Sequence, residues 1–416
     1  MNPDQSRALV RPFDGYRFAA RDRLNELLAP PYDVITPADR ERLASRHPDN
    51  IVHYILPQGG DDPYLHAAGT LRRWIGSGVL ERDGAPTVTV LRQTFVQPDG
   101  QTVSRAGVIG GIAVEPFSTG RVKPHERTHS GPKADRLALL RATEAMFEEL
   151  LLLARDPSGD LREAMDAVMR SPPWGTARVQ EADVTIWHVA GAGAQTLAGA
   201  AGSGALYLAD GHHRYETAVT YVGENPSANR IPCLVVPIDD PGLVVGPTHR
   251  LLYGPPINAG TLVSQFRERF QLRELPPEAH YVEELAPLAS RGTACVLVLP
   301  GSQALALLLK SGARLGDLPF AGEPAVAALD VARVDELIVK RLAAAMGETA
   351  RVEYSSDSAY VIDEVRTGRA AYGVLLNATP VEAVLAVADA GAVMPQKSTF
   401  FTPKVPSGVV GIRYSA

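Results

Sequence analysis

The residues with the clearest capacity for chemistry lie in the stretch Ala209-Asp210-Gly211-His212-His213-Arg214-Tyr215. An arginine presents a planar fork of N–H donors that suits a phosphate or a carboxylate, and a histidine becomes a cation when it is protonated. A carboxylate such as Asp210 supplies oxygen ligands of the kind that Mg²⁺ prefers. The stretch therefore predicts an anion site with Asp210 as its metal ligand and, as its phosphate ligands, Gly211, His212, His213 and Arg214.

Two elements are expected to hold this stretch in place. Ala205–Ala209 is a short apolar run that indicates a strand, and Tyr215–Tyr221 has apolar residues at helical spacing. Backbone N–H groups in the first turn of a helix point outward, and the helix dipole favours negative charge there. A strand, a glycine turn and a helix start thus predict a cradle for an anion. The alternative interpretation is a surface turn whose histidines are incidental.

A loop at residues 117–132 holds a second cluster of ionisable side chains. The loop follows a predicted hairpin and precedes a strong helical pattern, and such positions favour a functional site over a merely solvated loop. The members of the cluster fall within seven residues and are Lys123, His125, Glu126, Arg127 and His129.

Three further places in the chain carry cations. Lys133 and Arg136 fall in the first turn of a helix expected at about Pro132–Arg155. Cations there oppose the helix dipole, and a bound anion would offset that cost. The other two places are the end of an apolar run and the tail of the chain, namely His249 with Arg250, and Met394–Lys404.

The alternation of strand and helix patterns indicates an α+β fold with mixed sheets. Thr87–Phe95 and Gln101–Val114 are predicted strands, joined by the hairpin signal Gln97-Pro-Asp-Gly100. Asn50–Leu56 is read as another strand. Thr36 is expected to cap the helix that follows it.

Composition bounds the class of protein. A chain of 416 residues suggests two or three domains or lobes. A formal net charge of −6 argues against the broad basic surface of a nucleic-acid-binding protein. The two cysteines, Cys233 and Cys295, offer neither zinc spacing nor a disulfide framework. No apolar run is long enough to span a bilayer, and the N-terminus lacks the apolar core of a signal peptide, so we expect a cytoplasmic protein without a membrane or nucleic-acid partner.

The stretch Ala209–Tyr215 resembles the phosphate-binding box of the ParB/sulfiredoxin-like fold, and most closely the Asp-Gly-x-His-Arg box of free-serine kinases. The whole chain resembles the bacterial and archaeal domain-of-unknown-function family 1015. The stretches that carry this resemblance are Ala29-Pro-Pro-Tyr-Asp-Val-Ile35, Lys123-Pro-His-Glu-Arg-Thr128, Gly131-Pro-Lys-Ala-Asp-Arg136, Ala209–Ala218, Pro247-Thr-His-Arg250 and Met394-Pro-Gln-Lys-Ser-Thr399.

The resemblance implies both an architecture and an activity. It implies a ParB/sulfiredoxin-like phosphate-binding core at residues 85–255, an N-terminal α/β segment at 1–84 and a C-terminal α/β lobe at 256–416. The implied activity is a serine-kinase-like phosphotransferase, which phosphorylates the hydroxyl of a free amino acid such as L-serine. ATP, ADP or pyrophosphate would be the donor, with Mg²⁺ present. In such kinases a catalytic glutamate follows a Pro-His-Glu-like segment, which implies Glu126 as the base. With Asp210 and His213 of the Ala209–Tyr215 stretch it makes up the expected catalytic set.

Several alternatives stay open. Glu126 is either the base or one half of a loop salt bridge, and Tyr32 and Asp33 are either turn residues or part of the site. A nucleotide-binding regulatory protein without turnover would use the same cationic pocket. Peroxiredoxin repair is disfavoured because His212 stands where sulfiredoxin has its cysteine, and a zinc hydrolase lacks a clear third ligand.

Overall fold

The computed structural model describes residues 8–97, 99–126, 128, 130–257, 259–277, 280–301 and 303–415, so Arg127 and His129 of the loop cluster lie outside the described residues. The chain divides into two compact units. The first comprises residues 1–124, 128–244 and 403–416, and the second comprises residues 125–127 and 245–402. The predicted N-terminal segment thus shares a unit with most of the predicted core, and a subdivision at residue 84 stays a prediction.

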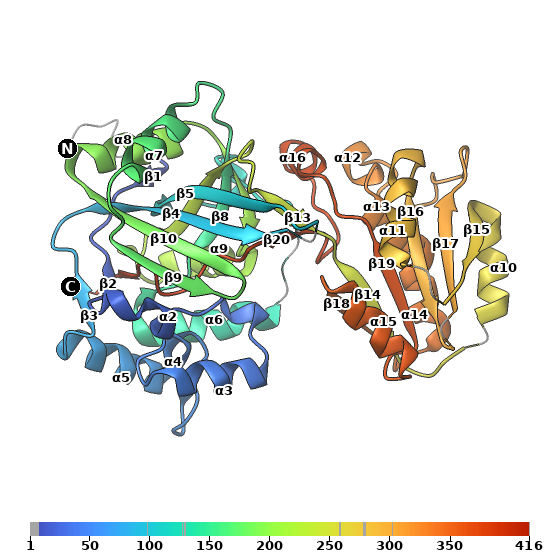
Figure 1. Cartoon of the computed structure of the whole chain (residues 1–416), viewed down its shortest axis with the longest axis horizontal. Helices are drawn as coiled ribbons and strands as arrows, with labels where there is room; N and C mark the ends of the chain where they lie inside the picture. The colour runs from blue at the N-terminus through green and yellow to red at the C-terminus, as the bar shows by residue number, and fades with distance from the viewer. Residues whose placement is uncertain are drawn as a thin grey trace. The chain divides into compact units, whose positions relative to one another are not determined.

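A nine-stranded mixed sheet forms the centre of the first unit (Figure 1). Most neighbouring strands are antiparallel, whereas β12 runs parallel to β8. This mixture confirms the predicted α+β class; the ParB/sulfiredoxin-like label stays a prediction. The strands, in their order across the sheet, are β6 (Val122–Lys123), β11 (Leu206–Asp210), β8 (Leu150–Ala154), β12 (Arg230–Pro237), β5 (Thr102–Ala113), β4 (Thr87–Val96), β10 (Ala182–Ala190) and β9 (Gly175–Val179), with β1 (Val10–Arg11) beside β5.

Helices cover the sheet of the first unit. Figure 1 shows α7 (Asp160–Met169) and α8 (Gly191–Ala201) on one side of this sheet, where both pack on β4, β5 and β10. On the other side, α6 packs against α5 and α9. The remaining bounds are α2 (Leu24–Leu27), α3 (Pro37–Arg46), α4 (Val52–Ile55), α5 (Pro63–Gly76), α6 (Ser130–Thr143) and α9 (His212–Val222).

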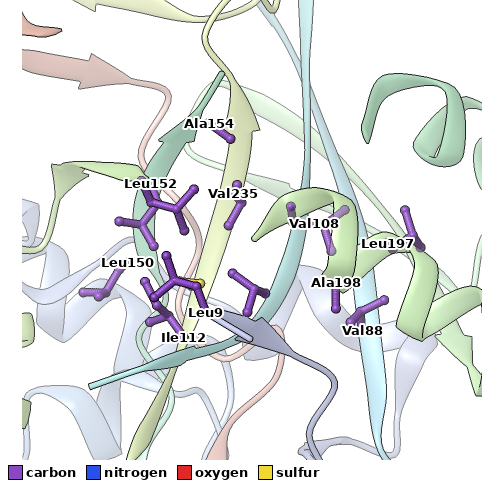
Figure 2. Close-up of a cluster of buried hydrophobic side chains, with 14 of the residues drawn as sticks. Leu9, Val88, Val108, Ile112, Leu150, Leu152, Ala154, Leu197, Ala198 and Val235 are labelled. Atoms are coloured by element: carbon purple, nitrogen blue, oxygen red, sulfur yellow. The ribbon is translucent and has the colours of Figure 1, made fainter. Parts of the chain in front are cut away.

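The core of the first unit is built from inward-facing strand residues and the small-residue face of α8. Figure 2 shows Val108, Leu152 and Val235, from three strands, within this cluster, with Leu197 and Ala198 of α8 near Val88. All of these side chains are buried. Burial of apolar surface of this kind is the main favourable term in folding, and it sets the sheet as a rigid base for the turns at its edge.

The local signals in the sequence produce the predicted elements at two places. The hairpin between β4 and β5 is confirmed, since Gln97 N–H donates to Gln101 O at 2.8 Å and Gly100 takes φ +86°. The Thr36 cap is also confirmed, because the Thr36 hydroxyl oxygen accepts a hydrogen bond from Asp39 N–H at 3.1 Å.

Two predicted elements are wrong. The strand expected at Asn50–Leu56 is the short helix α4, because the buried Asn50 side chain accepts from Val52 N–H at 2.9 Å and thereby starts a helical turn. The helix expected to run to Arg155 ends at Thr143, and Glu144 turns the chain with φ +49°. The apolar run after it becomes the fully buried strand β8, and periodicity alone does not separate a buried strand from a buried helix.

The second unit contains a six-stranded sheet. Its strands in order are β15 (Phe270–Leu275), β17 (Gln303–Leu309), β16 (Ala294–Leu299), β19 (Tyr372–Leu376), β14 (His249–Tyr253) and β18 (Arg351–Ser355), and all the pairs are antiparallel. Its helices are α10 (Ala259–Arg269), α11 (Tyr281–Leu285), α12 (Pro324–Ala327), α13 (Asp330–Val334), α14 (Lys340–Met346), α15 (Ser358–Arg366) and α16 (Val381–Asp389), with a π-helical turn at Asp335–Val339. Over the described stretches of both units, none of the helices has the length and apolar character needed to cross a membrane.

Candidate functional site

The predicted strand, glycine turn and helix start are confirmed at residues 210–214, which we call the Asp210–Arg214 turn. Strand β11 ends at Asp210, Gly211 takes φ +95°, and α9 begins at His212 without a side-chain cap. A Cβ at Gly211 would lie 2.5 Å from Leu150 Cδ2, so glycine is required both by conformation and by space. Three backbone N–H groups at the start of α9 therefore carry the partial positive charge of the helix dipole.

Asp210 is held between two cations. Arg214 Nη2 donates to Asp210 Oδ2 at 2.7 Å, and Arg214 Nη1 donates to the backbone oxygen of Glu149 at 2.8 Å. Lys404, from the C-terminal segment (residues 403–416), pairs with Asp210 Oδ1. Arg214 is only 2 % exposed, so its guanidinium links Asp210 to the backbone just before β8 from inside the unit.

Arg105 is a further cation that sequence reasoning missed. It lies opposite Gln93 in the β4–β5 ladder, and its Nη2 donates to Gln93 Oε1 and to Pro403 O, both at 2.5 Å. Gln93 Nε2 in turn donates to Lys404 O at 2.9 Å. Side chains of β4 and β5 therefore hold the backbone of residues 403 and 404 in place, and Lys404 is the residue that pairs with Asp210. Only pairing across the sheet brings these side chains to the C-terminal segment, and the local sequence carries no signal for it.

Three cations act on the carboxylate of Asp210. Burial lowers the pKa of Arg105 to about 10, and attraction to Asp240 and Asp210 opposes that effect. Arg105 Nε and Nη1 are buried without a hydrogen-bond partner among the described residues. Arg105, Arg214 and Lys404 thus all act on Asp210, although Arg105 is also attracted to Asp240 and Arg214 to Glu148. A cluster of buried cations of this kind favours an anion bound nearby.

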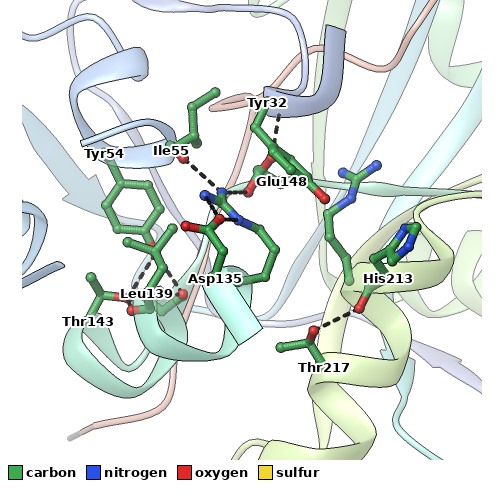
Figure 3. Close-up of polar contacts among 12 residues, drawn as sticks. Tyr32, Tyr54, Ile55, Asp135, Leu139, Thr143, Glu148, His213 and Thr217 are labelled. Carbon is green, nitrogen blue, oxygen red and sulfur yellow. Dashed lines mark hydrogen bonds and ion pairs between the residues drawn. The ribbon is translucent and has the colours of Figure 1, made fainter. Parts of the chain in front are cut away.

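A second ionic network adjoins the turn. Arg136 Nη1 donates to Glu148 Oε2 at 3.2 Å and to Ile55 O at 2.7 Å, and Arg136 also pairs with Asp135 at 2.6 Å. Its guanidinium lies 4.2 Å from the centroid of the Tyr32 ring. Figure 3 shows Tyr32, Glu148 and Asp135 converging on this network. Arg136 is therefore buried with its charge already matched.

The two networks act on one another electrostatically. Burial by itself would lower the pKa of Arg214, but attraction to Asp210, Glu148 and Asp33 raises it above its ordinary value. Asp33 is exposed and belongs to the 3₁₀ turn Tyr32–Val34, so it adds an open carboxylate to the first unit. Glu148, like Arg105, was missed, because it falls in a segment whose secondary structure was wrongly predicted.

Glu149 is a buried acid beside the turn. It is 2 % exposed, its Oε1 accepts from Val410 N–H at 3.1 Å, and its Oε2 has no partner among the described residues. Burial raises the pKa of Glu149 to about 8, and the hydrogen bond from Val410 opposes that rise only in part. Near neutral pH this side chain is mostly a neutral carboxylic acid, so it does not cancel the cations around Asp210.

The Glu149 carboxyl makes the stability of the protein depend on pH. Because its pKa is raised from 4.5 to about 8 on folding, the folded protein binds this proton more tightly than the unfolded chain. The free energy of unfolding should therefore fall as the pH rises from about 4.5 to about 8, by at most about 1.4 kcal/mol per pH unit. Urea unfolding of the wild type and Glu149→Gln at pH 5 to 8 measures this contribution as the difference between their pH slopes. Identical slopes would rule out the buried acid as its source.

The other predicted ligands of the first unit have identified neighbours. Lys123 lies 5.4 Å from the centroid of the Tyr207 ring, and Lys133 Nζ pairs with Glu216 Oε2 of α9 at 2.8 Å. His212 is buried, whereas His213 is half-buried and its backbone oxygen accepts from the Thr217 hydroxyl at 2.8 Å (Figure 3). The structure therefore gathers Lys133 and the Asp210–Arg214 turn around α9.

Glu126, His249 and Arg250 belong to the second unit. Glu126 forms an isolated parallel β-bridge with Met394. Burial chiefly raises the pKa of Tyr354, and the Glu126 carboxylate also raises it. The guanidinium of Arg250 lies 5.3 Å from the centroid of the Tyr354 ring. Glu126 and Arg250 therefore both act on Tyr354 within this unit.

His249 and Arg250 are both engaged in the interior of the second unit. His249 Nδ1 accepts from Leu376 N–H at 3.1 Å, and burial lowers the pKa of His249 to about 4, so the ring is neutral at physiological pH. Arg250 donates to Asp335 from Nε at 2.8 Å and from Nη2 at 3.1 Å, and it is fully buried. The Arg250–Asp335 ion pair and the hydrogen bond of His249 to Leu376 therefore stabilise the sheet of the second unit.

The residues at the turn do not form a ready-made magnesium site. Both Asp210 oxygens contact cations, Arg214 and Lys404, which a Mg²⁺ ion would have to displace. Among the residues that the structure covers, no group of three or more His, Cys, Asp or Glu side chains is arranged to hold a metal. The prediction that Asp210 is a metal ligand therefore gains no support from its contacts.

Comparison with known proteins gives one family and several distant structures. The family model described as protein of unknown function, DUF1015, matches residues 10–332. No curated protein matches the chain.

Three solved structures are similar to parts of the chain. A conserved hypothetical protein from Pyrococcus furiosus is 15% identical over 74% of this chain and 95% of its own, with a TM-score of 0.38. A free serine kinase in complex with AMP is 16% identical over 73% of this chain and 92% of its own, with a TM-score of 0.38. SbnI with a C-terminal truncation, from Staphylococcus aureus, is 12% identical over 71% of this chain and 84% of its own, with a TM-score of 0.38.

Proposed function

The chain belongs to the DUF1015 family of proteins of unknown function, and from this premise we propose that it is a small-molecule phosphotransferase. The observation that carries the proposal is the cluster of cations at the Asp210–Arg214 turn. Arg105, Arg214 and Lys404 all act on the carboxylate of Asp210, next to the first turn of α9, and the attraction of Arg105 and Arg214 extends to Asp240 and Glu148. Phosphoryl transfer depends on cations that hold the donor and neutralise the charge that develops on the transferred group.

In this proposal the donor is a nucleotide or pyrophosphate, and its terminal phosphate binds at the start of α9. The backbone N–H groups of residues 211–213 and the side chains of His213 and Lys404 are its ligands, while Arg214 holds Asp210 in position. The predicted roles of Lys123, Lys133 and Arg136 as further donor ligands stay predictions, since Lys133 pairs with Glu216, and Arg136 with Asp135 and Glu148. The roles of His249 and Arg250 as further donor ligands stay predictions outside this proposal, because both side chains are buried and engaged in the second unit.

The proposed acceptor is the hydroxyl of a free amino acid, with L-serine as the first candidate. Its oxygen attacks the terminal phosphorus of the donor, the bond from phosphorus to the bridging oxygen breaks, and the shortened donor leaves with that oxygen. Glu126 accepts the proton that the hydroxyl loses.

Magnesium enters the proposal only together with the donor. Mg²⁺ is commonly bound through substrate phosphates with few protein carboxylates, which suits a turn whose carboxylate already contacts two cations. We also propose a cytoplasmic location, where nucleotides and free amino acids are available.

The test is a phosphoryl-transfer screen. Purified protein is incubated with Mg²⁺, with ATP, ADP or pyrophosphate, and with a panel of hydroxy-amino acids, and the products are read by mass spectrometry. The expected result is phosphoserine from at least one donor, lost when EDTA is present. Absence of any phosphorylated amino acid, together with measurable nucleotide binding, would favour the second candidate, a nucleotide-binding regulatory protein without turnover.

Replacing Lys404 tests the donor site directly. Lys404→Met is expected to weaken ADP binding by about 1.5–3 kcal/mol, the range for a hydrogen bond to a charged group, because the ammonium group contacts phosphate in the proposed complex. Calorimetric titration with ADP measures the change. Arg141→Met is the matched control, since it removes one positive charge at an exposed pair with Glu224. If both variants weaken ADP binding equally, the loss comes from the change in net charge and not from a contact between Lys404 and phosphate.

A further inference from the structure

A separate cavity of about 250 Å³ lies in the first unit, at the junction of α3, α4, α5 and α6. Its walls are mainly apolar, and three prolines give them flat surfaces. The apolar lining residues are Ile35, Pro37, Leu56, Pro57 and Pro63, and the polar ones are Thr36, Arg40, Gln58, Tyr64, Asp135 and Arg136. Apolar walls with a few polar groups are the usual composition of a small-molecule site.

Arg40 is the unusual member of this lining. It crosses from α3 to the end of α4, where its Nε donates to Leu56 O at 3.1 Å. Within the described ranges, its two Nη atoms have neither a hydrogen-bond partner nor an ion pair with a carboxylate. Burial lowers the pKa of Arg40 from its ordinary value, and attraction to Glu41 opposes this effect only in part. A partly desolvated guanidinium thus lines an apolar cavity with its outer fork of donors unused.

The remaining charges of the cavity compensate one another. Asp135 accepts from Arg136 Nη2 at 2.6 Å, from Arg136 Nε at 2.8 Å and from the Tyr64 hydroxyl at 2.7 Å. The Thr36 hydroxyl is engaged with Asp39. One positive charge, that of Arg40, is therefore left over in the lining.

We propose that this cavity binds a small monocarboxylate with an apolar body, whose carboxylate pairs with the Nη atoms of Arg40. A planar guanidinium binds a planar carboxylate through two parallel hydrogen bonds, and an apolar environment strengthens them. A single uncompensated cation matches a monoanion better than a phosphate dianion. The volume lies below the roughly 300–1,000 Å³ of drug-sized sites, so the body is small, and the walls formed by Pro37, Pro57 and Pro63 favour a flat ring.

Benzoate is a suitable probe, with benzamide as its neutral isostere. Saturation-transfer NMR and calorimetric titration of the full chain should show that benzoate binds at least about tenfold more tightly than benzamide, since a hydrogen bond to a charged group contributes this much. Arg40→Met should abolish the preference for benzoate. Arg42→Met is the matched control on the same helix, because Arg42 is exposed and pairs with Asp39; it should leave the preference unchanged.

Other outcomes would overturn the proposal. Equal binding of benzoate and benzamide by the wild type would remove the role of the carboxylate, and an unchanged preference in Arg40→Met would place the site elsewhere. Tighter binding of inorganic phosphate than of benzoate, dependent on Arg40, would replace the monocarboxylate by an oxyanion. Arg40→Gln serves as a second variant if Arg40→Met fails to fold, since its amide retains a donor for Leu56 O. Because these readouts use no nucleotide or serine, they are independent of the proposed phosphotransferase activity.

Discussion

Glu126→Gln is expected to lower the rate of phosphoserine formation by roughly 10²–10⁴, the usual contribution of a general base, while ADP affinity stays unchanged. The amide keeps the shape of the side chain and its ability to hydrogen bond, but it does not take up the proton that the acceptor hydroxyl loses. Initial rates at saturating serine and donor measure the effect. Calorimetric titration with ADP and a thermal melt show whether binding and folding are preserved.

The control is Asp33, an exposed carboxylate of the first unit. It is exposed, it lies in the same unit as the Asp210–Arg214 turn, and it acts on the pKa of Arg214. Asp33→Asn should leave turnover within the range of the wild type if Glu126 is the base. The reverse pattern, in which Asp33→Asn is inactive and Glu126→Gln keeps wild-type turnover, would preserve the phosphotransferase and reassign its base.

Arg250→Met is expected to lower the free energy of unfolding of the second unit by about 3–5 kcal/mol. Arg250 is fully buried and donates twice to Asp335, so its removal leaves a buried carboxylate without compensation. Guanidinium unfolding of the full chain, followed by hydrogen exchange of the β14 and β19 amides, measures the loss. The effect is large because the penalty is the desolvated charge itself.

The double variant Arg250→Met with Asp335→Leu separates this effect from lost packing. Replacing both members of a buried ion pair by apolar residues is often close to neutral, so the double variant should recover most of the stability. A single variant that loses less than about 1 kcal/mol, the value typical of an exposed pair, would contradict the structural role and favour Arg250 as an available ligand.

Secondary structure followed from sequence wherever a local signal decided it. Gly100 and Gly211 occupy positions with positive φ, which few other residues adopt, and both turns form where they were predicted. Thr36 acts as a helix cap through a bond to its own neighbour. Asn50 misled the prediction because its side chain starts α4, and the run before Ala154 misled it because a fully apolar strand shows no alternation.

The candidate site likewise has one part that the sequence predicted and another part that only the folded chain brought together. The sequence by itself determined the Asp210–Arg214 turn, because its strand, glycine and helix start are contiguous and their backbone conformation depends on the residues themselves. Only the tertiary structure decided that Lys404 pairs with Asp210, because 194 positions separate the two residues in the chain. It also decided that Arg105, which lies across a strand ladder from Gln93, holds the backbone beside Lys404. It also decided that Glu149 is a neutral acid, because a pKa depends on burial, and burial is a property of packing and not of the local sequence.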